Sequence, residues 1–283
     1  MKPIRWHLAH NRHLDLGLQA HIMGILNVTP DSFSDGGRYG SIDDALRQAE
    51  RMVEEGASMI DIGGESTRPG ATAVTAEEEQ ARILPVIEEI ARRSDILISV
   101  DTYRSETARR ALEVGAHIVN DIWGLQHDPA IANLAADTGA GLVIMHNSRE
   151  RENRRAPVLD QFDFLEKSLQ IAKEAGVSRD HIVLDPGFGF GKEAKENIEL
   201  MANFEQLGAF DLPFLVGTSR KRLLGSLIGR EPQDRDIGTA ATSVLLRMKG
   251  AAIFRVHNVA ANRDALAVAD AVLVANQSIN NHM

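Results

Sequence analysis

The stretch Leu184-Asp185-Pro186-Gly187-Phe188-Gly189-Phe190-Gly191-Lys192 decides how the rest of this chain is interpreted. It completes an apolar run that begins at Ile182, which is typical of a buried strand ending in a carboxylate, and the three glycines let the backbone turn tightly. We therefore expect a ligand above Asp185. The glycine spacing does not fit a dinucleotide fingerprint, and Glu193 after Lys192 excludes a P-loop. A strand-capping Asp with ordinary turn glycines is the plainer alternative.

The same alternation of a short apolar run and a helical pattern recurs along the chain. Apolar runs of strand length occupy residues 21–28, 59–63, 96–100, 117–120, 141–145, 182–184, 214–217 and 252–256. Helical patterns cover residues 42–55, 105–113, 128–138, 159–175, 195–207, 237–249 and 259–275. A further helix is predicted to begin at Thr75, where Glu78 completes a capping box. Eight strand–helix units predict an α/β fold, a single-domain (β/α)8 TIM barrel. A doubly wound sheet with the same elements is the alternative.

Length and composition limit the domain organisation and the partners. A chain of 283 residues fits one barrel, so we expect an N-terminal lead-in at 1–20, the barrel at 21–277 and a C-terminal tail at 278–283. The net charge of -9 argues against nucleic acid or an anionic membrane as a partner. The absence of cysteine excludes disulfides and Cys-bound metals. No signal-peptide or membrane-spanning pattern occurs, so a cytoplasmic location is expected.

Polar side chains follow nearly every predicted strand, at the end where a TIM barrel carries its site. They are Asn27, residues 65–68, Asp101, Asn120, Asp121, His146, Asn147, Asp185, residues 219–221, Arg255 and His257. Helix N-caps explain some of the Asp, Asn and Ser residues but not the cations. Because Arg68, Lys221, Arg255 and His257 converge on one end of an acidic protein, they predict an anionic ligand such as a diphosphate ester.

Three predicted connections are longer than usual and lie at this same end, at residues 28–40, 67–74 and 148–157. The first two contain glycines, prolines and hydrogen-bonding side chains, which suits loops that cover a ligand. The third is a run of charges and is more simply a solvated surface. Asn27 and Asp35 could offer oxygen atoms to Mg²⁺, which binds one or two protein ligands together with substrate phosphates.

Two segments resemble the signatures of the dihydropteroate synthase family, namely residues 25–37 (ILNVTPDSFSDGG) and 61–70 (DIGGESTRPG). Further matching segments are 99–102, 119–121, 184–192, 217–222 and 255–257. The resemblance covers roughly residues 20 to 275 in the family's order. It implies that 6-hydroxymethyl-7,8-dihydropterin diphosphate condenses with 4-aminobenzoate to dihydropteroate and diphosphate in folate biosynthesis. It also implies a Mg²⁺ cofactor, binding of sulfonamide-type analogues and a homodimer.

The family's functional positions carry over residue by residue. The resemblance assigns the pterin to Asp101, Asn120, Met145, Asp185, Gly217 and Lys221, and the diphosphate to Asn27, Arg68, Arg255 and His257. It assigns the 4-aminobenzoate to Phe33, Thr67, Pro69, Phe190 and Lys221. The implied catalytic residues are Asn27, Asp35, Arg68 and Lys221, and the implied Mg²⁺ ligands are Asn27 and Asp35.

Two other classes of protein remain open. A pterin-binding methyltransferase domain that serves a corrinoid partner needs the pterin pocket but not the cations Arg68, Arg255 and His257. A non-catalytic pterin- or phosphate-binding protein would have little use for Phe33 and Pro69 on the two loops.

Overall fold

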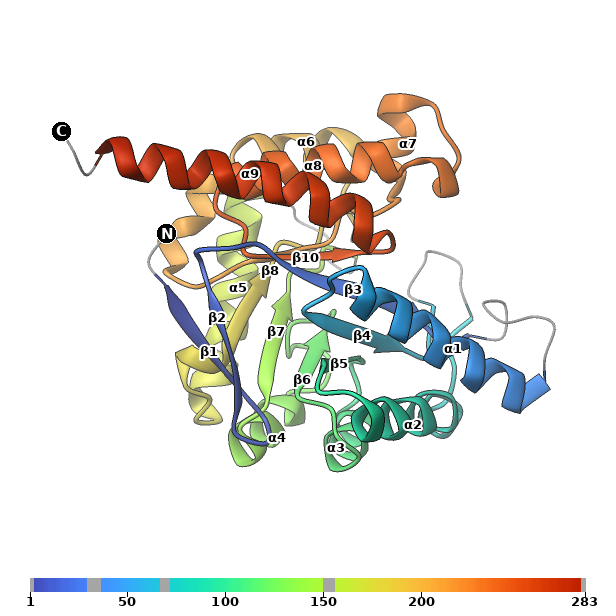
Figure 1. The fold of residues 1–283 in the computed structure, drawn as a ribbon. Coiled ribbons are helices and arrows are strands. Elements are labelled where there is room, and N and C mark those ends of the chain that lie inside the picture. The colour runs from blue at the N-terminus through green and yellow to red at the C-terminus, as the bar shows by residue number, and fades with distance from the viewer. Residues whose placement is uncertain (1–2, 30–36, 67–71, 150–155, 281–283) are drawn as a thin grey trace.

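The computed structural model describes residues 3–29, 37–66, 72–149 and 156–280. Within these ranges eight parallel strands form one curved sheet (Figure 1). They are β3 (His21–Asn27), β4 (Met59–Gly63), β5 (Leu97–Asp101), β6 (Ile118–Asp121), β7 (Gly141–Met145), β8 (Ile182–Asp185), β9 (Leu215–Val216) and β10 (Ile253–Val256). Strand β10 pairs with both β3 and β9, and a bridge between Leu184 and Phe214 joins β8 to the segment before β9. The predicted TIM barrel is therefore confirmed.

Helices surround the strands (Figure 1). They are α1 (Gly37–Glu54), α2 (Ala76–Arg93), α3 (Ser105–Glu113), α4 (Ala130–Thr138), α5 (Pro157–Glu174), α6 (Ala194–Ala202), α7 (Arg222–Ile228), α8 (Asp236–Met248) and α9 (Val259–Asn280). The capping box at the start of α2 is present, because Thr75 Oγ1 accepts from Glu78 N and Glu78 Oε2 accepts from Thr75 N.

Three details differ from the sequence-based expectation. The helix predicted at 195–207 ends at Ala202, where the side chain of Asn203 donates to the Glu199 carbonyl, and the chain continues as a 3-10 segment (Phe204–Phe210). Helix α7 was not predicted, since its seven residues are too few for a helical period to stand out. The third difference concerns the N-terminal residues.

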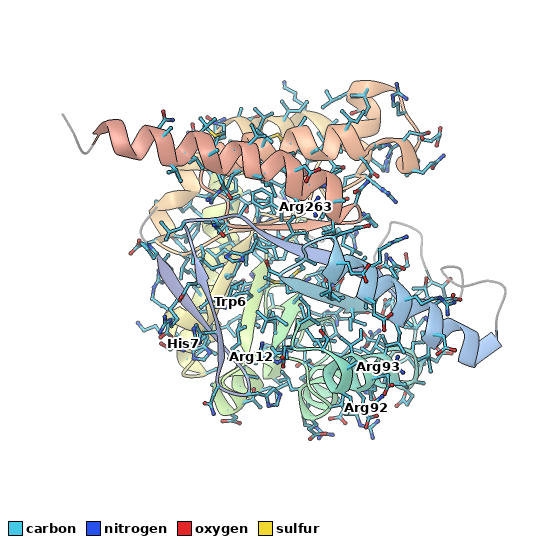
Figure 2. All side chains as sticks on the ribbon, viewed as in Figure 1. Trp6, His7, Arg12, Arg92, Arg93 and Arg263 are labelled. Carbon is cyan, nitrogen blue, oxygen red and sulfur yellow. The ribbon has the colours of Figure 1, made fainter. Side chains whose placement is uncertain are left out.

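Residues 4–16 form a hairpin that closes the N-terminal end of the barrel. Its strands, β1 (Ile4–Leu8) and β2 (Arg12–Leu16), pair antiparallel. Trp6, Leu8 and Leu16 share one buried cluster with one inward-facing residue from each of the eight parallel strands. These residues are Met23, Met59, Leu97, Ile118, Val143, Val183, Leu215 and Ile253. Trp6, labelled in Figure 2, donates its indole N–H to the His181 carbonyl at 2.8 Å. The barrel interior is therefore filled with apolar side chains at this end.

The outward-facing residues of the strands pack against the helices in a second, larger cluster that includes Ile60, Val100, Ile144 and Leu184. Because residues alternate between the two faces of a strand, each inward position lies two residues from the next. Among the described helices, none is both long and apolar enough to cross a membrane. Because apolar side chains fill the N-terminal end of the barrel, polar interior residues lie at the C-terminal ends of the strands.

Candidate active site

The inward position that follows the apolar layer on each strand is mostly polar. Two residues beyond that layer stand Asp61, Ser99, Asn120, Met145, Asp185, Gly217 and Arg255. Asp61, Ser99, Asn120 and Asp185 are all buried. The period of two along each strand therefore brings four predicted pterin residues, Asn120, Met145, Asp185 and Gly217, to one inward-facing level with Arg255, while Asp101 lies two residues further along β5.

Arg255 joins two carboxylates across the mouth of the barrel. Its Nε donates to Asp61 Oδ2 and its terminal nitrogen donates to Asp101 Oδ2, both at 2.6 Å. Asn120 Nδ2 donates to the same Oδ2 of Asp61 at 3.1 Å. Strands β4, β5, β6 and β10 are thus connected through one hydrogen-bond network. Arg255, which the sequence assigned to the diphosphate, lies in direct contact with the predicted pterin residue Asp101.

Asp61 and Ser99 did not stand out in the sequence. Both are fully buried, and Asp61 Oδ1 and Ser99 Oγ have no hydrogen-bond partner among the residues that the structure describes. Their signal was the period of two that begins at Met59 and Leu97, because it turns both side chains toward the barrel axis.

Burial and neighbouring charges shift the pKa values of two groups in this network. Burial raises the pKa of Asp101 to about 7, and Arg255 opposes this rise while Asp61 adds to it. Burial works against the charged form of Arg255 too, but Asp61 and Asp101 hold its pKa above the usual range. A pocket of this kind can accept hydrogen bonds from a ligand and can also exchange a proton near pH 7.

Asp185 ends β8 and is tied to the glycine loop that follows. Its Oδ1 accepts from Gly187 N at 2.7 Å, and burial raises its pKa while the charge of Lys221 opposes the rise. Gly187 has a φ of 62°, and a Cβ there would lie 1.9 Å from the His146 carbonyl oxygen. Only glycine therefore allows this loop to lie against the end of β7.

Lys221 and Phe190 face each other beside Asp185. Lys221 Nζ donates to the Phe188 carbonyl and lies 4.7 Å from the centre of the Phe190 ring. The guanidinium of Arg149 lies 4.6 Å from the same ring centre. Burial lowers the pKa of Lys221 to about 8, and Asp185 opposes this effect. These contacts place a cation and an aromatic face next to the candidate pterin pocket.

The remaining predicted residues fall into two groups. His257 follows β10, with Nδ1 2.9 Å from Ser219 Oγ, and Asn27 ends β3 in a half-buried position. Met145 is buried at the end of β7, and Gly217 follows β9. The predicted residues Phe33, Asp35, Thr67, Arg68 and Pro69 lie outside the residues that the structure describes.

A partly buried ion cluster connects the second signature segment to the residues just before α2. Arg104 donates to Glu65 at 2.7 Å, to Glu79 at 2.9 Å and to the Val74 carbonyl at 2.8 Å. Glu65 follows β4 and Val74 precedes α2, so one guanidinium ties both together. Burial raises the pKa of Glu79, and hydrogen bonds from Thr102 as well as the charge of Arg104 oppose the rise. No local pattern in the sequence predicts this cluster, because its charged members are 14 to 39 positions apart.

A separate groove of about 600 Å³ lies at the hairpin end, lined by Arg5, His7, His10, Arg12, His13 and His181, among others. Figure 2 labels His7 and Arg12 in this region. Arg5 is paired with Asp15, and its side chain is 56% exposed. We place the candidate site at the opposite end, because the buried carboxylates and cations converge there.

Comparison with known proteins agrees with this placement. The family described as pterin binding enzyme matches residues 23–257. A dihydropteroate synthase of Bacillus subtilis is 49% identical over 238 residues, which make up 84% of this chain and 83% of the relative. A dihydropteroate synthase of Escherichia coli is 44% identical over 277 residues, covering 95% and 97%.

Solved structures show the same relationship. The Xanthomonas albilineans dihydropteroate synthase with 4-aminobenzoic acid has a TM-score of 0.89 and 42% identity, and the alignment covers 94% of this chain and 98% of that one. The Yersinia pestis dihydropteroate synthase with a sulfonamide drug has a TM-score of 0.87 and 42% identity over 95% and 99%. This chain therefore belongs to the pterin-binding enzyme family and, within it, to the dihydropteroate synthases.

Proposed function

We propose that the polar end of the barrel condenses 6-hydroxymethyl-7,8-dihydropterin diphosphate with 4-aminobenzoate, which releases diphosphate and gives 7,8-dihydropteroate for folate biosynthesis. The observation that carries this proposal is the convergence of Asp185, Asn120 and Asp101 with Arg255 and Lys221 inside one barrel mouth. The family assignment supports the same transferase activity. The role of each residue is part of the proposal.

The pterin ring fits the carboxylate at the end of β8. A pterin presents a ring N–H beside an exocyclic amine, and one carboxylate can accept both hydrogen bonds. Asp185 is buried, and Gly187 N holds its Oδ1 in place, so the carboxylate is already oriented before a ligand arrives. We assign Asp101 and Asn120 to the other polar atoms of the ring. We propose that Met145 gives the pocket an apolar wall and that Gly217, which has no side chain, leaves space for the ring.

The cations are suited to the departing diphosphate. Loss of diphosphate leaves an electron-poor methylene carbon whose positive charge the pterin ring can delocalise, while nearby donors stabilise the negative oxygens. We assign this role to Arg255 and His257, together with Arg68. Arg255 can serve both ends of the substrate, because it already bonds to Asp101 and its side chain remains 21% exposed.

Magnesium is the implied cofactor, and the described residues are compatible with it. Among them no group of three or more His, Asp or Glu side chains forms a metal cluster. Mg²⁺ needs only one or two protein oxygens when substrate phosphates complete its shell, and the amide of Asn27 at the end of β3 offers one. We propose Asn27 and Asp35 as its ligands. When bound, the ion would neutralise charge on the diphosphate.

The second substrate needs little activation. A neutral arylamine is already nucleophilic, so positioning against the pterin methylene is the main requirement. We propose that Phe190 and Lys221 hold the 4-aminobenzoate, since an aromatic face and a cation match its ring and carboxylate. Phe33, Thr67 and Pro69 belong to the same proposal. Sulfonamide-type analogues, which resemble 4-aminobenzoate, would compete for these contacts.

Measurement of diphosphate release separates the three classes of function. Release from the pterin diphosphate that requires 4-aminobenzoate, with formation of dihydropteroate, supports the synthase. Binding of the pterin without release in the presence of 4-aminobenzoate points to a binding protein. Methyl transfer from methyltetrahydrofolate to a corrinoid, without diphosphate release, points to the methyltransferase class.

We also propose a homodimer through the outer face of α8 and α9. These helices pack against each other and expose large apolar side chains, with Ile237 87%, Val268 66% and Leu245 54% exposed. Where such side chains form one contiguous patch, they mark a protein–protein contact. Light scattering should give twice the mass of one chain, and the double variant Val268→Asp, Leu245→Asp should give the mass of the monomer.

The division into domains and the cytoplasmic location stay predictions.

A further inference from the structure

Lys192 ends the glycine loop after β8, and its ammonium group is buried among three acceptors. Nζ donates to the Gly187 carbonyl at 2.9 Å and to the Phe190 carbonyl at 3.4 Å. The third contact joins Nζ to His146 Nδ1 at 2.9 Å. Three acceptors match the three hydrogens of an ammonium group. Lys192 Nζ therefore binds the loop at both of its ends, through the carbonyls of Gly187 and Phe190.

His146 also contacts helix α5, through its other ring nitrogen. Its Nε2 lies 2.9 Å from Asp160 Oδ2, which also accepts from Ser148 Oγ at 3.2 Å. Because Nδ1 receives a hydrogen from Lys192, Nε2 carries the ring hydrogen and donates it to Asp160. His146, Ser148 and Asp160 are all buried. The chain Lys192–His146–Asp160 therefore joins the β8 loop, the end of β7 and α5.

The contacts of Lys192 fix the position of particular backbone atoms more than they stabilise the fold. Burial lowers the pKa of Lys192 to about 7, and Asp185 opposes the effect. A buried ammonium is often no more stabilising than an apolar side chain of similar size, so its advantage lies in directing specific atoms. The atoms directed here are the carbonyls of Gly187 and Phe190.

The loop between these carbonyls carries the groups that face Lys221. Phe188 supplies the carbonyl that accepts from Lys221 Nζ, and the Phe190 ring lies under the same ammonium. Gly191 presses against the backbone of residues 148 and 149, where a Cβ would lie 2.6 Å from Arg149 N. A shift of this loop would therefore move both contacts of Lys221 at once.

We propose that Lys192 is a positioning residue, which with His146 and Asp160 holds the glycine loop so that Phe188 and Phe190 place Lys221 for the 4-aminobenzoate. The kinetic consequences of this role rest on the proposed function. The structural claim, that Lys192 holds the loop in place, is independent of it. The proposed pterin residues Asp101, Asn120 and Asp185 lie on strands, outside the loop. Within the described part of the chain only one hydrogen bond links them to it, from Gly187 N to Asp185, so binding of the pterin should depend less on Lys192.

The kinetic test uses Lys192→Met, which keeps the aliphatic stem and removes all three donors. We expect KM for 4-aminobenzoate to rise about tenfold or more, while Kd for the pterin diphosphate, measured by calorimetry without 4-aminobenzoate, changes less than about threefold. Lys192→Arg retains charge and donors and should recover most of the loss. Lys195→Met, at an exposed position of α6, is the matched control and should change neither constant.

Hydrogen exchange tests the hold on the loop without any substrate. In the full chain, Lys192→Met should speed exchange in a peptide covering residues 186–192 by about tenfold, with the β7 peptide unchanged. Unchanged exchange in that peptide would overturn the proposal. So would equal losses of pterin and 4-aminobenzoate binding, since they would indicate general damage. If the unmodified protein releases no diphosphate, the proposed function fails, but the exchange result still decides the role of Lys192.

Discussion

Asp61, Asp101 and Asp185 are three carboxylates buried in one barrel mouth, and their neighbours differ. Asp61 and Asp101 share Arg255, whereas Asp185 accepts a backbone N–H and lies near the charge of Lys221. Burial raises the pKa of Asp101 to about 7, so the folded protein binds more protons than the unfolded chain between about pH 4 and 7. Asp101 therefore lowers the free energy of unfolding as pH rises through this window.

Asp185→Asn should weaken pterin binding. The amide keeps the size of the side chain but replaces one accepting oxygen with a donor that faces the pterin N–H groups. Loss of a charge-assisted hydrogen bond predicts a penalty of about 2 kcal/mol or more, roughly 30-fold in Kd. Calorimetry with hydroxymethylpterin measures this, with Asp137→Asn on the exposed face of α4 as the control. Equal affinities for the two variants would remove Asp185 from the role.

Arg255→Ala should destabilise the protein, and more so at high pH. Removal of the guanidinium leaves Asp61 and Asp101 as unpaired buried carboxylates, a loss that typically costs about 3–5 kcal/mol. The raised pKa of Asp101, about 7, means that this carboxyl is mostly protonated at pH 5.5, where the penalty shrinks. Urea unfolding should therefore show a larger deficit at pH 8 than at pH 5.5.

The control for this experiment is Arg263→Ala, which removes an exposed arginine labelled in Figure 2 whose ion pair with Asp264 lies at the surface. Exposed pairs of this kind contribute about 1 kcal/mol or less. A deficit of Arg255→Ala that is the same at both pH values would show that the two carboxylates do not carry the effect. The variant should also weaken diphosphate binding more than binding of free hydroxymethylpterin.

At the scale of elements, the hairpin β1–β2 and the strand ends have separate tasks. The hairpin fills the N-terminal end of the barrel with Trp6, Leu8 and Leu16, while the loops at the other end carry the candidate site. Changes in the hairpin should therefore affect stability far more than chemistry.

Trp6→Ala tests this separation. The substitution removes a fully buried indole and the hydrogen bond to the His181 carbonyl, which predicts a loss of about 3–5 kcal/mol in the free energy of unfolding. Well below the melting temperature, kcat should stay within about twofold of the unmodified protein. Leu18→Ala, at a site 61% exposed just past β2, is the control and should change stability little. A large fall in kcat of the folded variant would contradict the separation.

At the scale of the whole molecule, the two substrates should bind in a coupled manner. Lys221 is assigned to both of them, and residues 25–37 and 61–70 each combine proposed diphosphate or metal residues with proposed 4-aminobenzoate residues. Ligands that share such segments influence each other's affinity, and the influence is reciprocal.

We expect Mg²⁺ and diphosphate together to tighten the binding of 4-aminobenzoate by about 5- to 150-fold, the usual range of such coupling. Calorimetry with the protein alone, with Mg²⁺ alone and with both additions measures the effect. Tight binding to the protein alone, unchanged by the additions, would rule out the coupling. Phe33→Ala should raise KM for 4-aminobenzoate more than KM for the pterin substrate.

The strands, their parallel order and the polar end of the barrel could be predicted from local patterns. Each strand is a short apolar run bounded by turn residues, and each observed boundary lies next to the predicted one. Asp185 and Arg255 stood out because a charged residue at the end of an apolar run has no local explanation. Asp61 and Ser99 were not predicted as site residues, since only the period of two inside a strand distinguishes a polar residue that faces the barrel interior.

The contacts that organise the site depend on the tertiary structure, because they join residues far apart in the chain. Arg255 reaches Asp61 across 194 positions and Asp101 across 154, and Lys192 reaches His146 across 46. Trp6 contacts the His181 carbonyl across 175 positions. Local sequence encodes the period and the turns of each element, whereas closure of the barrel decides which buried charges and which apolar faces meet. A buried charge is stable only with its partner, so these pairings exist only once the barrel has closed.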